Sequence, residues 1–188
     1  MGGKRRLYVV LAAVLVAVGA ASYALADQLD GPGKVPDSKE FKATLNGFQE
    51  TPSVSTTGFG EFRATLDEHA AVPTIHFVFR YGGLEGGHSL FAHVHFGERG
   101  VAGGVSYFLC GGSTKPNPCP DVEGVIEGDI TAADVVGPTG QGIEPGSFDE
   151  ILRAMRAGHS YANIHTTRWP GGEIRGQINN EDQKQFDK

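Results

Sequence analysis

The chain of 188 residues carries 22 acidic and 16 basic residues, a net charge of −6 at pH 7. This acidic balance excludes nucleic acids and anionic lipid surfaces as partners, because both require basic patches. The length and the hydrophobic content of 39% fit a single domain with an ordinary core.

An export signal is predicted at the N-terminus. Residues 4–6 are basic, residues 7–20 are apolar and uncharged, and Ala24-Leu25-Ala26 forms a small-x-small cleavage motif. We therefore predict a secretory signal peptide over residues 1–26 and a secreted, periplasmic or cell-surface location. The alternative is an uncleaved anchor, which is the one way we expect this chain to contact a membrane. After cleavage, 13 basic residues remain against 22 acidic ones, a net charge of −9.

The polar segments at both ends bound the predicted domain. Residues 27–40 are polar and contain several Gly and Pro, which indicates a linker. Residues 179–188 are polar and charged, which indicates a C-terminal tail. The domain is therefore expected over residues 41–178.

Between these ends the sequence pattern is typical of β-strands. Short segments alternate apolar and polar side chains, and many of the 28 glycines cluster at the breaks between them. In chain order the predicted strands are 41–45, 60–66, 74–81, 90–96, 104–109, 124–130, 161–166 and 173–178. We predict an all-β fold, an antiparallel β-sandwich or Greek-key barrel of about eight strands.

One short helix is predicted before the last two strands. Ser147 is a suitable N-cap, and Glu150 three residues later completes a capping-box pattern. An apolar stripe follows at helical spacing, and Gly158 suits the position after the helix. We expect this helix to cover one end of the β-structure, without a chemical role.

The two cysteines, Cys110 and Cys119, are the only ones in the chain. A close, even pair in an exported protein predicts a disulfide, which would close a loop rich in Gly, Pro, Ser and Asn. Two free thiols are the alternative. Two cysteines alone are too few ligands for a metal site.

His93 and His95 are the most informative residues of the chain. They lie two apart in a predicted strand, so both side chains point to the same face. His165 lies in a second predicted strand. If the fold brings the three rings together, with nitrogens about 3–4 Å apart, they can bind one ion such as copper or zinc.

Other residues are candidates for support of this site. His88 lies in a glycine-rich loop and is a candidate fourth ligand, and Asn163 shares the face of His165 and can hydrogen-bond a ligand. Isolated histidines, His69, His76 and His159, are expected to be ordinary polar residues. Ser89 and Ser106 lack a nucleophile-elbow sequence, so no catalytic residue is assigned.

Several sequence motifs together are similar to those of the CHRD domain, the module first described in chordin. The matching segments, in order, are Leu45-Asn46-Gly47-Phe48-Gln49-Glu50-Thr51-Pro52, Ala92-His93-Val94-His95-Phe96-Gly97, Tyr161-Ala162-Asn163-Ile164-His165-Thr166 and Pro170-Gly171-Gly172-Glu173-Ile174-Arg175-Gly176-Gln177-Ile178. They span about residues 41–178. The resemblance implies a β-rich fold and says little about activity.

The strand around His93 and His95 also resembles the copper-binding strand of Cu,Zn superoxide dismutase. That likeness implies that His165 is a copper ligand and that Arg175 attracts an anion to the site. On the residues alone, Arg175 could equally pair with Glu173. The chain departs from the dismutases in lacking a separate zinc cluster and a bridging histidine, so we treat the likeness as a structural analogy.

Three functions follow, in order of preference. The first is an exported binding module that holds a transition metal, copper or zinc, at His93, His95 and His165. The second is a structural or adhesive extracellular domain without metal, and the third is a copper redox enzyme of the dismutase type. The expected partner is a metal ion, and the sequence specifies no protein partner.

Overall fold

A computed structural model of the chain describes residues 37–180. The predicted signal peptide over residues 1–26 and most of the predicted linker and tail lie outside the described residues. Within the described part, no helix is both long and apolar enough to cross a membrane. The β-structure begins at Glu40 and ends at Asn180, so it extends slightly past both predicted domain boundaries.

Eight strands form one antiparallel sheet, as the sequence predicted. They are β1 (Glu40–Asn46), β2 (Phe59–Asp67), β3 (Thr74–Gly82), β4 (Ser89–Phe96), β5 (Gly104–Cys110), β6 (Gly124–Ile130), β7 (Ser160–Thr166) and β8 (Ile174–Asn180). Their order across the sheet is β5-β4-β7-β8-β1-β2-β3-β6. Every observed segment overlaps a predicted one, and each differs from it by two residues or fewer at either end.

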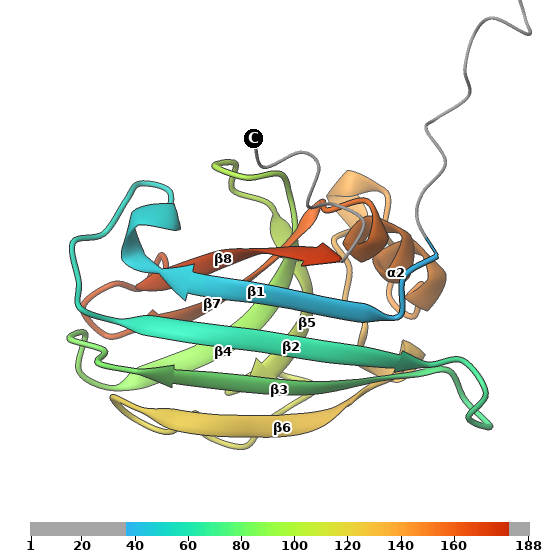
Figure 1. Cartoon of the computed structure of the whole chain (residues 1–188), viewed down its shortest axis with the longest axis horizontal. Helices are drawn as coiled ribbons and strands as arrows, with labels where there is room; N and C mark the ends of the chain where they lie inside the picture. The colour runs from blue at the N-terminus through green and yellow to red at the C-terminus, as the bar shows by residue number, and fades with distance from the viewer. Residues whose placement is uncertain (1–36, 181–188) are drawn as a thin grey trace, which may run out of the picture. The chain divides into compact units, whose positions relative to one another are not determined.

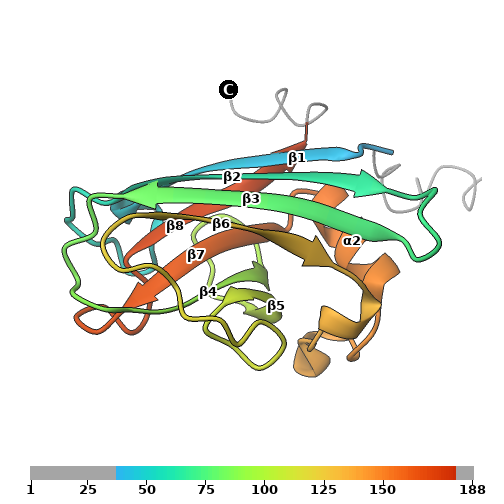
Figure 2. The ribbon, with the colours of Figure 1, turned by 90° about the horizontal axis from the view of Figure 1, so that it is seen from below.

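The sheet folds over on itself into two layers and nearly closes into a barrel. Figure 1 shows β1, β2, β3 and β6 in one layer with the other four strands behind it, and Figure 2 shows both layers from the edge. The strands at the two ends of the order, β5 and β6, approach each other. The all-β sandwich or barrel architecture is therefore confirmed.

The core lies between the two layers and follows from the period-two pattern of the strands. On β3, alternate residues Ile75, Phe77 and Phe79 are buried, while the residues between them face outward. The facing layer contributes Val94 from β4 and Ile164 from β7, both fully buried. Each such side chain stabilises the fold by about 1.5–3 kcal/mol through removal of apolar surface from water.

Helix α2 (Phe148–Arg156) lies at one end of the two layers, where the sequence placed it (Figure 1). Its stripe of Phe148, Ile151, Leu152 and Met155 is buried. Gly158 adopts φ +74°, as expected for the residue that ends a helix. The predicted capping box is wrong, because the Ser147 side chain makes no capping hydrogen bond. Three short 3-10 helices, Gly47–Gln49, Ala132–Asp134 and Thr139–Gln141, complete the described structure.

The predicted disulfide is present between Cys110 and Cys119, whose Cα atoms are 5.3 Å apart. Cys110 is the last residue of β5, and Cys119 lies in the loop that leads to β6. Both are buried. The bond ties the end of β5 to the segment that enters the opposite edge strand.

One outer face of the sheet is buried beneath loops. The loop of residues 97–103 folds back over β7 and β8, where Arg175 donates to the carbonyls of Glu98 and Val101 and Gln177 donates to that of Gly97. The polar side chains on the outer face of β4, β7 and β8 are therefore shielded from solvent.

Candidate metal centre

Strand pairing brings the three predicted ligands together. Antiparallel β4 and β7 pair so that His93 lies opposite Asn163 and Phe91 lies opposite His165, which makes His165 a diagonal neighbour of His93. The ring centroids of His93 and His95 are 4.3 Å apart, and those of His93 and His165 are 4.6 Å apart. The two strands, 70 residues apart in sequence, thus build one cluster of imidazoles.

Backbone hydrogen bonds select one tautomer for two of the rings. The Nδ1–H of His95 donates to the Gly103 carbonyl at 2.8 Å, and the Nδ1–H of His165 donates to the Pro170 carbonyl at 2.9 Å. A carbonyl oxygen can only accept, so Nδ1 carries the proton and Nε2 keeps its lone pair. Such hydrogen bonds orient ligand histidines in metal sites.

Three buried ring nitrogens have no hydrogen-bond partner: Nδ1 of His93, Nε2 of His95 and Nε2 of His165. One ligand nitrogen from each residue lies within 4.8 Å of the other two. An ion held at about 2.0–2.1 Å by three imidazoles separates the nitrogens by roughly 3.3–3.5 Å. Binding therefore requires the ligand nitrogens to approach one another by up to about 1.5 Å, a movement within the reach of side-chain rotation.

Burial keeps all three imidazoles neutral at physiological pH. Their exposed fractions are 3% for His93, 8% for His95 and 6% for His165. Desolvation lowers the pKa of His93 to about 2, and repulsion between protonated rings lowers it further. It lowers the pKa of His95 to about 4 and also lowers that of His165. A neutral imidazole is the form that binds metal.

Aromatic side chains wall the cluster. Phe91 stacks on His93 and contacts His165, with centroids 5.3 and 4.8 Å apart, and Phe108 meets His93 edge-on at 5.4 Å. Tyr161 lies parallel to His95, with centroids 4.6 Å apart and planes 6° apart. The walls exclude water and restrict the rotation of the rings.

Asn163 lies where the sequence placed it, beside the imidazoles. It is 2% exposed and is the cross-strand neighbour of His93. Its side chain opposes the lowering of the pKa of both His93 and His95, and its Oδ1 has no hydrogen-bond partner. The amide is thus close enough to bond a ligand histidine or an atom held between the rings.

Arg175 lies behind Tyr161 and is 2% exposed. Its guanidinium carbon is 3.4 Å from the centroid of the Tyr161 ring, and it donates to the Thr51 hydroxyl as well as to the 97–103 loop. It does not pair with Glu173. That carboxylate instead accepts hydrogen bonds from the backbone at Glu85 and Gly86 and from the hydroxyls of Thr56 and Thr166.

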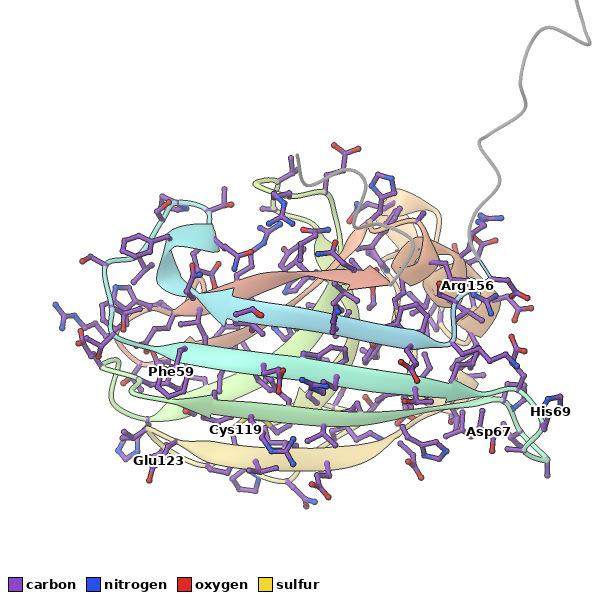
Figure 3. All side chains as sticks on the ribbon, viewed as in Figure 1. Phe59, Asp67, His69, Cys119, Glu123 and Arg156 are labelled. Carbon is purple, nitrogen blue, oxygen red and sulfur yellow. A yellow bond between two sulfur atoms is a disulfide. The ribbon has the colours of Figure 1, made fainter. Side chains whose placement is uncertain are left out.

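The structure does not bring His88 to the cluster. Its ring bonds to the Asp121 carboxylate at 2.8 Å, and its side chain is 82% exposed. The remaining histidines are also apart from the cluster. His76 pairs with Asp129, His159 lies near Glu98, and His69 projects from the turn between β2 and β3 (Figure 3).

Sequence reasoning missed two residues of this region. Glu50 is 7% exposed, its Oε1 has no partner, and burial raises its pKa to about 7 against the lowering effect of Arg175. Tyr161 fixes the plane of His95. Both residues lie within the sequence motifs that resemble the CHRD family. Their position in those motifs is the signal that could have identified them.

A family model for the CHRD domain matches residues 41–178. The chain belongs to the CHRD domain family. The match covers nearly all of the β-structure and includes the three clustered histidines, Asn163 and Arg175, so the site lies within the CHRD domain itself. No curated protein and no solved structure matches the chain.

Proposed function

We propose that this CHRD domain is an exported module that binds one transition-metal ion, copper or zinc, through Nδ1 of His93 and Nε2 of His95 and His165. The observation that carries the proposal is the convergence of three neutral, buried ring nitrogens without hydrogen-bond partners. Leaving a buried polar atom unpaired costs about 1–3 kcal/mol, so three in one place form a strained arrangement that an ion relieves.

The donor set favours copper or zinc over hard cations. All three donors are imidazole nitrogens, and calcium and magnesium require oxygen ligands. Three protein ligands would leave a coordination position open, as in catalytic zinc sites. The chain's own residues hold the ligand tautomers, through Gly103 and Pro170, and exclude water through the aromatic walls.

Export is part of the same proposal. The predicted signal peptide over residues 1–26 directs the domain out of the cytoplasm, and the Cys110–Cys119 disulfide is typical of oxidising compartments. The mature domain then meets metal ions at the cell surface or beyond it.

Equilibrium dialysis of the purified exported protein, followed by metal analysis, tests the proposal. We expect one copper or zinc ion per chain in the wild type and loss of at least 100-fold in affinity when His93 and His95 are both replaced by Ala. The matched control replaces His76 and His88, two exposed histidines paired with carboxylates, and should leave the affinity unchanged.

The adhesive or structural alternative gives a different result. It predicts no stoichiometric ion in the wild type, or the same affinity in both double variants. Either outcome contradicts the metal-binding proposal.

A further inference from the structure

A buried positive charge stands next to the histidine cluster. Arg175 makes its polar contacts to a hydroxyl and two backbone carbonyls and lies on the face of Tyr161. Within residues 37–180 it forms no salt bridge with a carboxylate. A guanidinium stays charged when it is buried, so this charge acts on its surroundings through a medium of low dielectric constant.

The charge lies on the side of Tyr161 that faces away from His95. β7, which carries Tyr161, lies between β4 and β8, and the ring stacks on His95 of β4 while Arg175 reaches it from β8. The guanidinium carbon lies 3.4 Å from the Tyr161 centroid, and that centroid lies 4.6 Å from the centroid of the His95 ring, so the charge of Arg175 is close to the cluster. A cation held by the three histidines would be repelled by this charge.

The ligands themselves supply no compensating charge. All three are neutral, and the cluster that could hold an ion contains no carboxylate or thiolate. The carboxyl group that acts on Arg175 is Glu50, which burial keeps largely protonated below neutral pH. Arg99 adds a second positive charge on that side.

We propose that Arg175 sets a charge preference at the centre, which binds monovalent copper, Cu(I), in preference to the divalent ions Zn(II) and Cu(II). The proposal rests on the metal-binding function above. A divalent ion feels twice the repulsion of a monovalent one, and three neutral imidazoles cannot offset the difference. Coulomb's law at an effective dielectric constant of about 20 and a separation of about 8 Å gives an effect of roughly thirtyfold in relative affinity.

Glu50 should act in the opposite direction. When its carboxyl is ionised it partly cancels the charge of Arg175 and makes a divalent ion more acceptable. The variant Glu50→Gln removes that compensation with little change in shape. It should therefore weaken Zn(II) binding more than Cu(I) binding, whereas the loss of Arg175 should strengthen Zn(II) relative to Cu(I).

The test compares Arg175→Met with Arg175→Lys. Both lose the paired hydrogen bonds to the 97–103 loop, but Lys keeps the positive charge. Cu(I) affinity is measured by competition with a chromophoric chelator, with ascorbate as the reductant so that the disulfide stays intact and no thiol is freed. Zn(II) affinity is measured by chelator competition, and the Cu(II)/Cu(I) midpoint potential by voltammetry.

We expect the ratio of Cu(I) to Zn(II) affinity to fall at least tenfold in Arg175→Met and to stay within threefold of wild type in Arg175→Lys. A tenfold fall in Cu(I) affinity relative to Cu(II) corresponds to a drop of about 59 mV in midpoint potential. Equal changes in the Met and Lys variants, or an unchanged ratio in both, would overturn the charge preference while leaving metal binding intact. Absence of any bound metal in the wild type would overturn both proposals.

Discussion

The two faces of β4 and β7 are both buried, yet they carry opposite kinds of side chain. The middle of the inner face is apolar, and Ala92, Val94, Ala162 and Ile164 pack there in the core. The outer face is polar, and each of His93, His95, Asn163 and His165 has a buried nitrogen or oxygen atom there without a hydrogen-bond partner. If only the stability of the fold mattered, both buried faces would be expected to carry apolar side chains, as the inner face does. The outer face keeps polar atoms where apolar ones would serve stability better, which indicates a site.

The largest expected effect tests the inner face. Ile164→Ala removes a fully buried side chain and should lower the free energy of unfolding by about 2–5 kcal/mol, because it leaves a cavity in the core. The metal affinity of the folded protein should stay within threefold of wild type. Urea unfolding of metal-free protein and equilibrium dialysis measure the two quantities. A loss of metal binding without loss of stability would reverse the roles assigned to the two faces.

His165→Leu tests the outer face at the neighbouring residue. We expect metal affinity to fall at least 100-fold, about 3 kcal/mol in binding free energy, because one of three ligands is gone. The stability of the metal-free protein should change little, since the variant removes the unpartnered Nε2 but also the hydrogen bond from Nδ1 to the Pro170 carbonyl. Isothermal titration with the metal and urea unfolding without it separate the two effects. A large loss of metal-free stability would show that the histidine is a structural element instead.

The disulfide should support the scaffold more than the site. Replacing Cys110 and Cys119 by Ser should lower the free energy of unfolding by about 2–3 kcal/mol, the expected value for so short a loop. Cys110 pairs across the sheet with Ala92, on the inner face beside His93. Thermal melts of the variant and the wild type measure the change. Metal binding that disappears in a variant that still folds would instead place the disulfide in the site.

The dependence of stability on pH should reveal the buried histidines of the outer face. A histidine in the unfolded chain has a pKa of 6.5, and folding lowers that of His95 to about 4 and that of His93 to about 2. The unfolded state therefore binds more protons in this interval, and the free energy of unfolding should fall as pH decreases from 6.5 to 4. The expected slope exceeds about 1 kcal/mol per pH unit for metal-free protein.

Glu50 affects the pH dependence of the unfolding free energy in the opposite direction to the histidines. Folding raises its pKa from 4.5 to about 7, so its contribution to stability is complete below pH 4.5 and is lost as pH rises through 7. Urea unfolding between pH 4 and 8 should give a steeper dependence in Glu50→Gln and a shallower one in His95→Leu. Ile164→Ala, on the inner face, should keep the wild-type slope. Equal slopes in all four proteins would contradict the neutral, buried state of the cluster.

The smallest effect is expected for His88→Ala. The ring is exposed and pairs with Asp121, so both metal affinity and stability should remain close to wild type. Competition assays and thermal melts check this. A marked loss of metal affinity would show that His88 is a ligand and that its loop moves over the cluster when metal binds.

Much of the fold was predictable because strand patterns are local. Alternation of apolar and polar residues located all eight strands, and the short spacing of Cys110 and Cys119, together with the predicted export signal, predicted their bond. The capping box failed because a matching pair of residues does not ensure the side-chain rotamers that the hydrogen bonds need. His88 lies beside Asp121 and apart from the other three histidines, because loop position does not follow from the strand pattern.

By itself the sequence determined that His93 and His95 share a face and that His165 lies on a strand, because side-chain direction on a strand depends on local geometry. The tertiary structure decided that these strands are neighbours, that loop 97–103 covers their outer face, and that Arg175 and Tyr161 stand behind His95. Those features depend on pairing between residues far apart in the chain, and on burial, which no short segment specifies.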